Sequence, residues 1–506
     1  MIGKVFLVGA GPGDRGLFTL KGYDALQKAD VVVYDALVGE GVLNLIPEGA
    51  RLIDVGKRAG NHTMPQEDMN KVLLKEALEG NTVVRLKGGD PFLFGRGGEE
   101  LELLVENDVP FEIIPGVTSA ISVPAYNGIP VTHRDFTSSL HIITGHKRKG
   151  EEYDIDFKAL KDTKGTLVFL MGFSALGDIV KGLLEAGMDK EMPVAVLQQG
   201  TTSRQKRAVG TLATIEEESK KQAIHTPAII VVGKVCALAE QFFWYEKLPL
   251  FGKKILLTRP KETASRTAAM LREQGAEVLE LPAIKTLPIS PNEALSKAFM
   301  ELREKRGDKP GFCDWLLFTS PIGVRVFFEE FSREHDIREL FGSKIAAIGE
   351  GTKKALLEKG LKVDFMPSVY DGETLGKELA SKLSGKETLL IPRAEIGGKE
   401  LTDELGKVSG VTIYDIPTYK TEYALSKVID ERKAIEAGEI DLAVFTSAST
   451  VRGFKEAVGD LDFSSLKAIC MGKQTMAEAE KLGMHCVMAK KPTIEALVEK
   501  VIEAAK

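Results

Sequence analysis

The chain has 506 residues, of which 43% are hydrophobic and 28% are charged, and its net charge at pH 7 is -6. This composition is typical of a globular protein with roughly three to five domains, and it excludes a broadly basic nucleic-acid binder. No apolar run reaches the roughly eighteen residues needed to span a bilayer, and the first residues lack the features of a signal peptide. We therefore expect a cytoplasmic protein with no membrane partner and no nucleic-acid partner.

Short runs of Val, Ile and Leu alternate with amphipathic stretches, such as 66–79 and 97–107, along the first half of the chain. This alternation predicts an α/β fold with largely parallel sheets. Ligands of such sheets bind at the carboxyl ends of the strands, where Gly or a polar residue follows most of these runs. The expected strands are 4–11, 30–35, 82–90, 111–116, 140–146, 166–172, 194–200 and 228–235.

The glycine turn after the first strand has two features of a dinucleotide-binding fingerprint. Gly11, Gly13 and Gly16 have the spacing G-x-G-x-x-G, and an acid, Asp35, follows about twenty residues on. Pro12 stiffens this turn, however, and Asp14 puts a negative charge where a pyrophosphate would approach. The turn alone leaves open NAD, another nucleoside cofactor or a purely structural role.

Later turns of the first half add candidate binding residues. Gly88 and Gly89 allow a ligand to approach the backbone closely, and Asp90 can accept hydrogen bonds from a hydroxyl or ammonium group. Hydroxyls follow the strand at 111–116, and the stretch 128–134 ends in a His-Arg pair on an expected loop.

Two stretches interrupt the strand–helix pattern. Residues 146–158 are charged and unpatterned, which predicts a loop inside the first half. Residues 240–253 are rich in aromatic residues and precede a new strand, so we expect the main domain boundary near Leu250.

The second half contains an internal repeat. Residues 316–331 resemble 443–458, and residues 344–366 resemble 467–489. The repeat predicts two similar α/β lobes that face a cleft. A duplicated scaffold with no shared function is the alternative.

Hydroxyl residues stand at corresponding strand-to-helix turns of the two copies. Helix N-termini and hydroxyls bind anions without a cation, so several of them around one cleft indicate a ligand with several carboxylates or phosphates. The candidates are Ser320, Thr352, Ser447 and Thr475.

Four cysteines lie far apart and form no C-x-x-C pair and no Cys/His cluster with metal-ligand spacing. We expect reduced, mostly buried thiols and no bound metal. They are Cys236, Cys313, Cys470 and Cys486.

Longer stretches of the sequence resemble two known enzyme families. Residues 1–240 closely resemble uroporphyrinogen-III C-methyltransferases of the tetrapyrrole methylase family, through stretches such as LVGAGPGD, VGKRAGNHTMPQ, VRLKGGDPFLFGRGGEE and GIPVTHR. Residues 252–506 resemble uroporphyrinogen-III synthase, through the two pseudo-repeated lobes, the paired FTS turns and PTYKT at 417–421. The chain is therefore similar to a fusion of the two enzymes.

The resemblance implies a two-lobed methylase fold followed by a bilobal α/β synthase fold. The methylase would cover 1–245, with lobes at about 1–115 and 116–245, and 246–253 would be a linker. The synthase would cover 254–506, with lobe one at about 254–286 plus 420–506 and lobe two at about 287–419.

For the methylase half, the resemblance implies that S-adenosylmethionine (SAM) donates two methyl groups to uroporphyrinogen III, at C2 and C7, to give precorrin-2. Asp35 matches the family's proposed proton acceptor, although a loop-capping acid is the plainer alternative. Lys57 matches the proposed proton donor, although it could instead bind a substrate carboxylate. The implied SAM contacts are Pro12, Gly88, Gly89, Asp90, Leu93, Thr118, Ser119, Met171 and Gly200; the candidates for gripping the substrate carboxylates are Arg58, His133 and Arg134.

For the synthase half, the resemblance implies closure of linear hydroxymethylbilane to uroporphyrinogen III, with inversion of the last pyrrole and loss of water. No cofactor is implied. Tyr419 matches the family's favoured group for assisting departure of the hydroxyl, and packing at the junction of the lobes is its plainer alternative. The four hydroxyl residues of the repeated turns are the candidates for binding the substrate carboxylates.

The partners are thus small tetrapyrroles, and the resemblance implies a homodimer through the methylase half. Dehydrogenation and metal insertion would fall to other proteins, and the sequence does not decide between siroheme and cobalamin as end products. Three alternatives stay open: an NAD-dependent oxidoreductase in the first half, a methylase for another precorrin position, and a tetrapyrrole-binding module without synthase activity in the second half.

Overall fold

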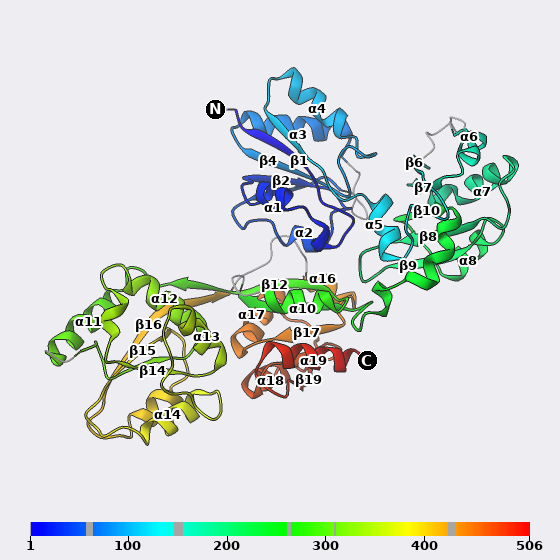
Figure 1. The fold of residues 1–506 in the computed structure, drawn as a ribbon. Coiled ribbons are helices and arrows are strands. Elements are labelled where there is room, and N and C mark those ends of the chain that lie inside the picture. The colour runs from blue at the N-terminus through cyan, green and yellow to red at the C-terminus, as the bar shows by residue number, and fades with distance from the viewer. Residues whose placement is uncertain (1, 57–63, 146–154, 261–264, 308–309, 424–430) are drawn as a thin grey trace.

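The computed structural model describes residues 2–56, 64–145, 155–260, 265–307, 310–423 and 431–506. Figure 1 shows a first lobe in blue, a second lobe in cyan and green beside it, and the C-terminal half below them in green to red.

The first lobe is built on a fully parallel sheet with the strand order β3-β2-β4-β1-β5. The inner strands β2 and β4 are rich in Val, and all their residues except Thr82 are buried, as expected for a parallel sheet that is covered on both faces. The strands are β1 (Lys4–Gly9), β2 (Val31–Tyr34), β3 (Arg51–Asp54), β4 (Thr82–Lys87) and β5 (Phe111–Ile114). The helices are η1 (Arg15–Leu17), α1 (Leu20–Leu26), α2 (Glu40–Leu43), α3 (Gln66–Leu78) and α4 (Gly97–Glu106). The next helix, α5 (Ser119–Tyr126), packs on the sheet of the second lobe.

Glycines bring the carboxyl ends of β1, β4 and β5 together. A Cβ added to Gly9 would lie 2.5 Å from the Gly116 backbone and 2.7 Å from the Gly89 carbonyl oxygen. Beyond β1, Gly11 and Gly89 exchange backbone hydrogen bonds of 3.2 and 2.7 Å. The three strand ends can approach this closely only because these positions lack side chains.

The second lobe has a mixed sheet with the order β6-β7-β10-β8-β9. Strand β10 runs antiparallel to β7 and β8, and β8 runs antiparallel to β9, so the prediction of largely parallel sheets is wrong for this lobe. The seven-residue connection at 199–205 is too short for a parallel crossover, which needs about a dozen residues. The elements are β6 (Leu140–Thr144), α6 (Phe157–Asp162), β7 (Thr166–Leu170), α7 (Leu176–Glu185), β8 (Pro193–Gln198), β9 (Lys206–Thr211), α8 (Ile215–Lys221), β10 (Ala228–Val232) and α9 (Ala239–Phe242).

All eight strands expected in the first half are present, and β3 and β9 were not expected. Both missed strands lie at sheet edges and carry charged residues, so their apolar signal is weak. Part of the loop expected at 146–158 falls outside the described residues, and α6 begins just before its end.

The C-terminal half forms one sheet of nine strands in the described residues, with the order β14-β13-β15-β16-β12-β11-β17-β18-β19. The long strands β12 and β16 cross between its two ends and pair antiparallel, 284–288 against 419–423. The strands are β11 (Lys254–Pro260), β12 (Glu277–Pro288), β13 (Trp315–Phe318), β14 (Lys344–Ala347), β15 (Thr388–Ala394), β16 (Thr412–Tyr423), β17 (Leu442–Phe445), β18 (Lys467–Cys470) and β19 (His485–Met488). The helices are α10 (Ser265–Glu273), α11 (Glu293–Arg306), α12 (Pro321–Phe331), α13 (Glu350–Glu358), α14 (Gly372–Ala380), α15 (Glu400–Leu405), α16 (Glu431–Glu436), α17 (Ala448–Val458), α18 (Lys473–Glu480) and α19 (Ile494–Ala505).

The predicted internal repeat is present in this half. The pair β13–α12 corresponds to β17–α17, and β14–α13 corresponds to β18–α18. Separate hydrophobic clusters pack on the two ends of the sheet, around Phe327 at one end and Phe454 at the other. The repeat therefore builds two lobes on one continuous sheet (Figure 1).

The segment that joins the two halves is packed along its length. Trp244 donates a hydrogen bond of 3.1 Å to the Ala125 carbonyl oxygen in the first half. Leu250 is fully buried in the core of the C-terminal half, and its backbone N–H donates to the Gln274 carbonyl oxygen at 2.8 Å. These contacts hold the two halves in a defined orientation.

The four cysteines are free, and Cys236, Cys313 and Cys470 are buried, as predicted. Among the described residues, no helix combines the length and the apolar character that a membrane crossing requires.

We expect Gly9→Ala to lower the free energy of unfolding of the first lobe by roughly 1–3 kcal/mol, because its Cβ would collide with the Gly116 backbone. Denaturant titration followed by circular dichroism measures this loss. Gly98→Ala is the matched control, since a Cβ at that helical position meets no atom within 4 Å. Equal stability of the two variants would contradict the close meeting of the strand ends.

Candidate functional site

The predicted cofactor-binding turns of the N-terminal half converge from both lobes. The Asp14 backbone N–H, two residues after Pro12, donates to Thr201 Oγ1 at 3.1 Å. Tyr126, at the end of α5, donates its hydroxyl to Asp14 Oδ2 at 2.6 Å. The turn after β1 therefore joins the helix that begins at Ser119 to the turn that contains Gly200.

The backbone around Gly89 fits a ligand. Gly89 has φ +71°, and a Cβ built on it would meet no atom within 4 Å, so this glycine faces open space. Its neighbour Gly88 packs against Leu37, two residues after Asp35, and a Cβ there would lie 2.6 Å from the Leu37 Cβ. The Gly-Gly turn thus has one face open beside the candidate proton acceptor, as a bound cofactor requires.

Residues with strained backbone conformations occur in or near the turns described above. Five residues other than glycine have positive φ at or near the carboxyl ends of β4, β7 and β8, a conformation that costs free energy and concentrates at functional sites. They are Phe94 (54°), Arg96 (56°), Met171 (54°), Gln199 (43°) and Thr201 (71°). The Met171 side chain is 52% exposed, so it is not the core residue that its strand would suggest.

Asp90 and Thr118 hold these turns through their own hydrogen bonds. Asp90 accepts from the backbone N–H groups of Phe92 (2.8 Å), Leu93 (3.1 Å) and Gly116 (3.0 Å). Thr118 caps α5 by accepting from the Ala120 N–H at 3.2 Å. Both residues shape the turns directly, and their contact with a cofactor stays a prediction.

Asp35 is held by a buried cluster of charges. Its Oδ2 accepts a hydrogen bond of 3.2 Å from Arg85, which lies 3.5 Å from Glu100, and Glu100 is also paired with Lys87. Arg85 is 3% exposed and Glu100 only 1%. Burial, followed by the nearby Arg85 charge, lowers the pKa of Lys87. The cluster fixes the Asp35 carboxylate at the rim of the site.

The sequence analysis missed Arg85, Lys87 and Glu100, although a signal for them was present. Arg85 and Lys87 stand two residues apart in a strand that is otherwise apolar, so they share one face of the sheet. Two buried cations on one face require a buried acid, and Glu100 on α4 supplies it.

The remaining predicted residues of this half lie apart from the network. His133 is in a turn closed by backbone hydrogen bonds with Thr137, and Arg134 beside it is exposed. No hydrogen bond or ion pair in the described part of the chain joins His133, Arg134 or Met171 to the other predicted residues. Lys57 and Arg58 lie outside the described residues.

In the C-terminal half, Tyr419 is paired with Ser320. Their hydroxyl oxygens are 2.9 Å apart, and Ser320 also caps α12 by accepting from the Gly323 N–H at 2.9 Å. Burial raises the pKa of Tyr419, and the hydrogen bond with Ser320 opposes this rise in part. Two residues predicted independently are therefore in contact at the helix N-terminus, with the tyrosine hydroxyl neutral.

The other hydroxyl candidates differ in their access. Ser447 caps α17 and lies 2.9 Å from the Ser449 hydroxyl. Thr352 and Thr475 lie in the first turns of α13 and α18 but are only 2% and 5% exposed, which leaves little of either side chain for a ligand. Their role in binding carboxylates stays a prediction.

Arg393, at the end of β15, is a further residue that the sequence analysis missed. Its guanidinium binds the Asp415 carboxylate with two hydrogen bonds of 2.6 and 2.5 Å. Its carbonyl oxygen accepts from Thr418, next to Tyr419. This bidentate pair joins β15 to β16 and so fixes the strand that carries Tyr419.

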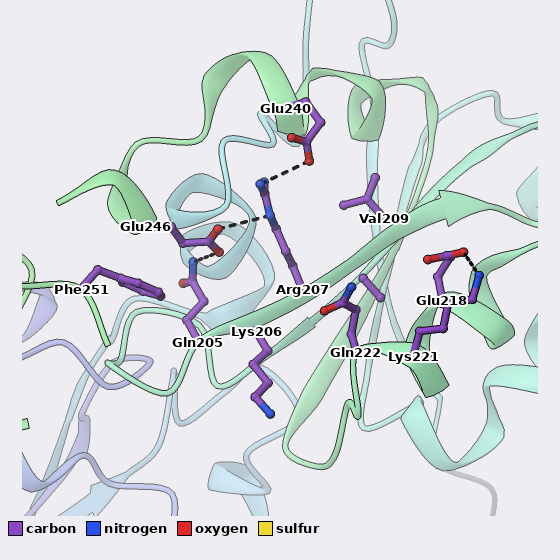
Figure 2. A pocket seen from close by; sticks show the side chains of 11 residues that line it. Gln205, Lys206, Arg207, Val209, Glu218, Lys221, Gln222, Glu240, Glu246 and Phe251 are labelled. Carbon is purple, nitrogen blue, oxygen red and sulfur yellow. Dashed lines mark hydrogen bonds and ion pairs between the residues drawn. The ribbon is translucent and has the colours of Figure 1, made fainter. Parts of the chain in front are cut away.

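A hollow of about 540 Å³ lies beside β9 and α8 (Figure 2), and none of the predicted site residues lines it. Its charges pair with one another: Arg207 lies 3.2 Å from Glu240 and 3.4 Å from Glu246, and Lys221 lies 2.9 Å from Glu218. This pairing leaves little free charge for a polyanionic ligand. In the described residues, no group of His, Cys, Asp and Glu could hold a metal ion.

Comparison with known proteins agrees with this two-part architecture. Residues 4–216 match the family model of tetrapyrrole (corrin/porphyrin) methylases, and residues 265–499 match that of uroporphyrinogen-III synthase HemD. The chain is 46% identical to the porphyrin biosynthesis protein HemD of Ruminiclostridium josui over 99% of this chain and 98% of that protein. The chain belongs to this family of fused porphyrin-biosynthesis enzymes. It therefore has a methylase half and a synthase half, and the NAD-dependent alternative is wrong.

Other relatives match the methylase half alone. The siroheme synthase of Enterobacter sp. (strain 638) is 51% identical over 243 residues. These residues are 48% of this chain and 52% of that protein, so the match covers about half of each. A crystal structure of uroporphyrin-III C-methyl transferase from Thermus thermophilus, complexed with S-adenyl homocysteine, is 39% identical, with a TM-score of 0.41 over 47% of this chain and 100% of that chain.

We expect Glu100→Gln to destabilise the methylase half by about 3–5 kcal/mol, because it removes the carboxylate that pairs with the buried Lys87 and leaves Arg85 with Asp35 as its remaining acid. Thermal unfolding by calorimetry measures the loss. Glu99→Gln removes the adjacent acid, whose pair with Arg96 is exposed, and should cost less than about 1 kcal/mol. Similar costs for the two variants would argue against a buried cluster.

We expect the Tyr419 hydroxyl to ionise above the ordinary tyrosine pKa of about 10, because burial favours its neutral form. The stability that this group contributes is then complete below about pH 10 and is lost as the pH rises through the folded pKa. Tyrosinate absorbance of the wild type minus that of Tyr419→Phe isolates the titration. A midpoint below 10 would show that the hydroxyl is not buried as described.

Proposed function

We propose that the synthase half closes hydroxymethylbilane to uroporphyrinogen III and that the methylase half methylates this product twice, at C2 and C7, to give precorrin-2. The observation that carries the proposal is the match of one chain to both families, over 4–216 and 265–499. The product of the second half is then the substrate of the first, and the fusion keeps the two steps in one molecule.

The methylase half requires a methyl donor, and we propose SAM. When bound, SAM supplies an activated methyl group, and the residues around Gly89 supply the open backbone turn that would hold it. Pro12, Thr118 and Gly200 lie in the turns that converge there. Their task is alignment, which by itself accounts for a large part of the rate in reactions of this kind.

Proton handling in the methylase falls to Asp35. Its carboxylate is held by Arg85 at 3.2 Å, while its Oδ1 accepts from the Leu37 N–H at 3.1 Å. The side chain remains one-quarter exposed, so it can take a proton from a substrate carbon. Lys57 as the proton donor, and Arg58, His133 and Arg134 as carboxylate-binding groups, remain part of this proposal.

In the synthase half, Tyr419 is the group proposed to assist departure of the substrate hydroxyl. Its raised pKa keeps the proton on the phenol, and Ser320 holds that phenol at the N-terminus of α12. The N-terminal turns of α12 and α17 offer positive dipole ends to the substrate carboxylates. No strongly acidic group is required, because the substrate itself has reactive pyrrole carbons.

We further propose that the protein works in the cytoplasm on small tetrapyrroles and that the methylase half forms a homodimer. Precorrin-2 is an intermediate of both siroheme and cobalamin formation. Sedimentation of the purified chain would test the dimer.

A single reaction tests both activities. The purified chain is given hydroxymethylbilane without oxygen, with and without SAM, and the products are identified by mass spectrometry and isomer chromatography. We expect uroporphyrinogen III without SAM and a doubly methylated product with it. Only the spontaneous isomer I without SAM would overturn the synthase role, and unmethylated uroporphyrinogen III would overturn the methylase role.

Two variants separate the halves in this reaction. Asp35→Asn should lower methylation by roughly 10²-fold or more, the usual contribution of a general base, with synthase activity unchanged. Tyr419→Phe should slow ring closure and leave methylation of supplied uroporphyrinogen III unchanged. An effect of either variant on the opposite half would contradict the assignment.

A further inference from the structure

Three turns of the methylase half contact the synthase half through charged or polar side chains. Arg15 lies 2.7 Å from Glu280, and Glu40 lies 2.8 Å from Lys254. The Ser203 hydroxyl donates to Glu277. The contacts come from the turns after β1, β2 and β8, and they end on β11 and β12.

Each contact lies close in sequence to a predicted residue of the methylase site. Arg15 is three residues after Pro12, Glu40 is five after Asp35, and Ser203 is three after Gly200. The synthase half therefore touches the turns that are proposed to bind the methyl donor and to handle the proton.

Lys254 is the most enclosed group of this interface. It is 4% exposed and lies 2.8 Å from Glu40, 3.3 Å from Glu439 and 4.0 Å from Glu277. Arg204 also reaches Glu439, at 2.7 Å. Burial raises the pKa of Glu439, but the charges of Lys254 and Arg204 outweigh it, so this pKa lies below its usual value. The pairing makes the docking geometry specific, because a buried charge without its partner is costly.

Glu280 forms a second anchor. It accepts from Arg15 of the methylase half at 2.7 Å and from Arg272 of its own half at 2.8 Å, and its side chain is 14% exposed. Arg272 fixes the carboxylate, so the position of Arg15 is set by the synthase half.

The three turns are also packed against one another. A Cβ on Gly39 would lie 2.6 Å from the Gly13 carbonyl oxygen, and one on Gly41 would lie 3.2 Å from the Arg15 Cβ. Thr201 accepts from the Asp14 N–H at 3.1 Å. The three turns are therefore in direct contact with one another.

The interface lies away from the synthase site. Lys254 and Glu277 begin β11 and β12, and Glu439 precedes β17, whereas Ser320 and Ser447 follow the carboxyl ends of their strands. Figure 1 shows α2 of the first lobe above β12, with α12 and α13 at the far end of the sheet. The methylase can dock here while the synthase turns stay free.

We propose that the synthase half braces the methyl-donor site of the methylase half, with Glu277, Glu280 and Lys254 as positioning residues for methyl-donor binding. This inference rests on the proposed function. It assigns to one enzyme of the fusion a structural role in the other, beyond keeping the two together.

The test uses the full-length double variant Glu277→Gln/Glu280→Gln, with Arg15→Gln as the corresponding change from the methylase side. Isothermal calorimetry measures the dissociation constant of S-adenosylhomocysteine, and hydrogen–deuterium exchange follows residues 13–17, 39–43 and 200–204. Synthase activity on hydroxymethylbilane reports whether the synthase half still folds. Lys285→Gln is the matched control, since its pair with Glu48 crosses the same interface but is about half exposed.

We expect the double variant and Arg15→Gln to weaken S-adenosylhomocysteine binding roughly three- to tenfold, which is less than the net contribution of one charged hydrogen bond, because the lost contacts act on the binding site only through the turns. Exchange in the three turns should accelerate, while synthase activity and the Lys285→Gln control stay near wild type. Unchanged S-adenosylhomocysteine binding in both interface variants would overturn the proposal that the synthase half stabilises the methyl-donor site. A wild-type chain that does not bind S-adenosylhomocysteine would instead overturn the proposed cofactor, which the wild-type titration shows separately.

Discussion

The ion pairs around Lys254 decide how the two halves of this chain sit against each other. A lysine this buried is tolerated only with its carboxylate partners in place, and those partners, Glu40, Glu277 and Glu439, come from both halves. Apolar packing alone would accept many docking angles, whereas enclosed charges accept few. The packed segment around Leu250 acts in the same direction, so the chain is a single assembly and not two enzymes on a flexible tether.

The same constraint acts inside the methylase half. Arg85 and Lys87 project from a central strand into the interior, where the buried Glu100 pairs with both. Because that arrangement is costly to distort, Arg85 is a rigid partner for the carboxylate of Asp35. Such fixed support suits the proposed role of Asp35 as the group that accepts a proton from a defined atom of the substrate.

The synthase half relies less on charge. Its candidate residues are hydroxyls at helix N-termini, and the Ser320–Tyr419 pair is neutral. This difference fits the two proposed reactions, because a substrate that carries its own reactive carbons needs folding and orientation more than a strong acid or base. The charged pair of Arg393 and Asp415 has a structural role here, because it joins β15 to β16, the strand that carries Tyr419.

The sequence by itself determined the strands with strong apolar runs, the repeat of the second half, the glycine and hydroxyl turns and the membership of both families, because each is a local pattern. Only the tertiary structure decided the antiparallel course of β10, the edge strands β3 and β9, the partner of Asp35 and the burial of Thr352. The contact between Arg15 and Glu280, which are 265 residues apart, could not be predicted from the sequence either. Strand pairing and charge pairing join segments that are distant in sequence. A local pattern can indicate that a buried cation needs an acidic partner, but it does not identify which acid lies beside that cation in the folded chain.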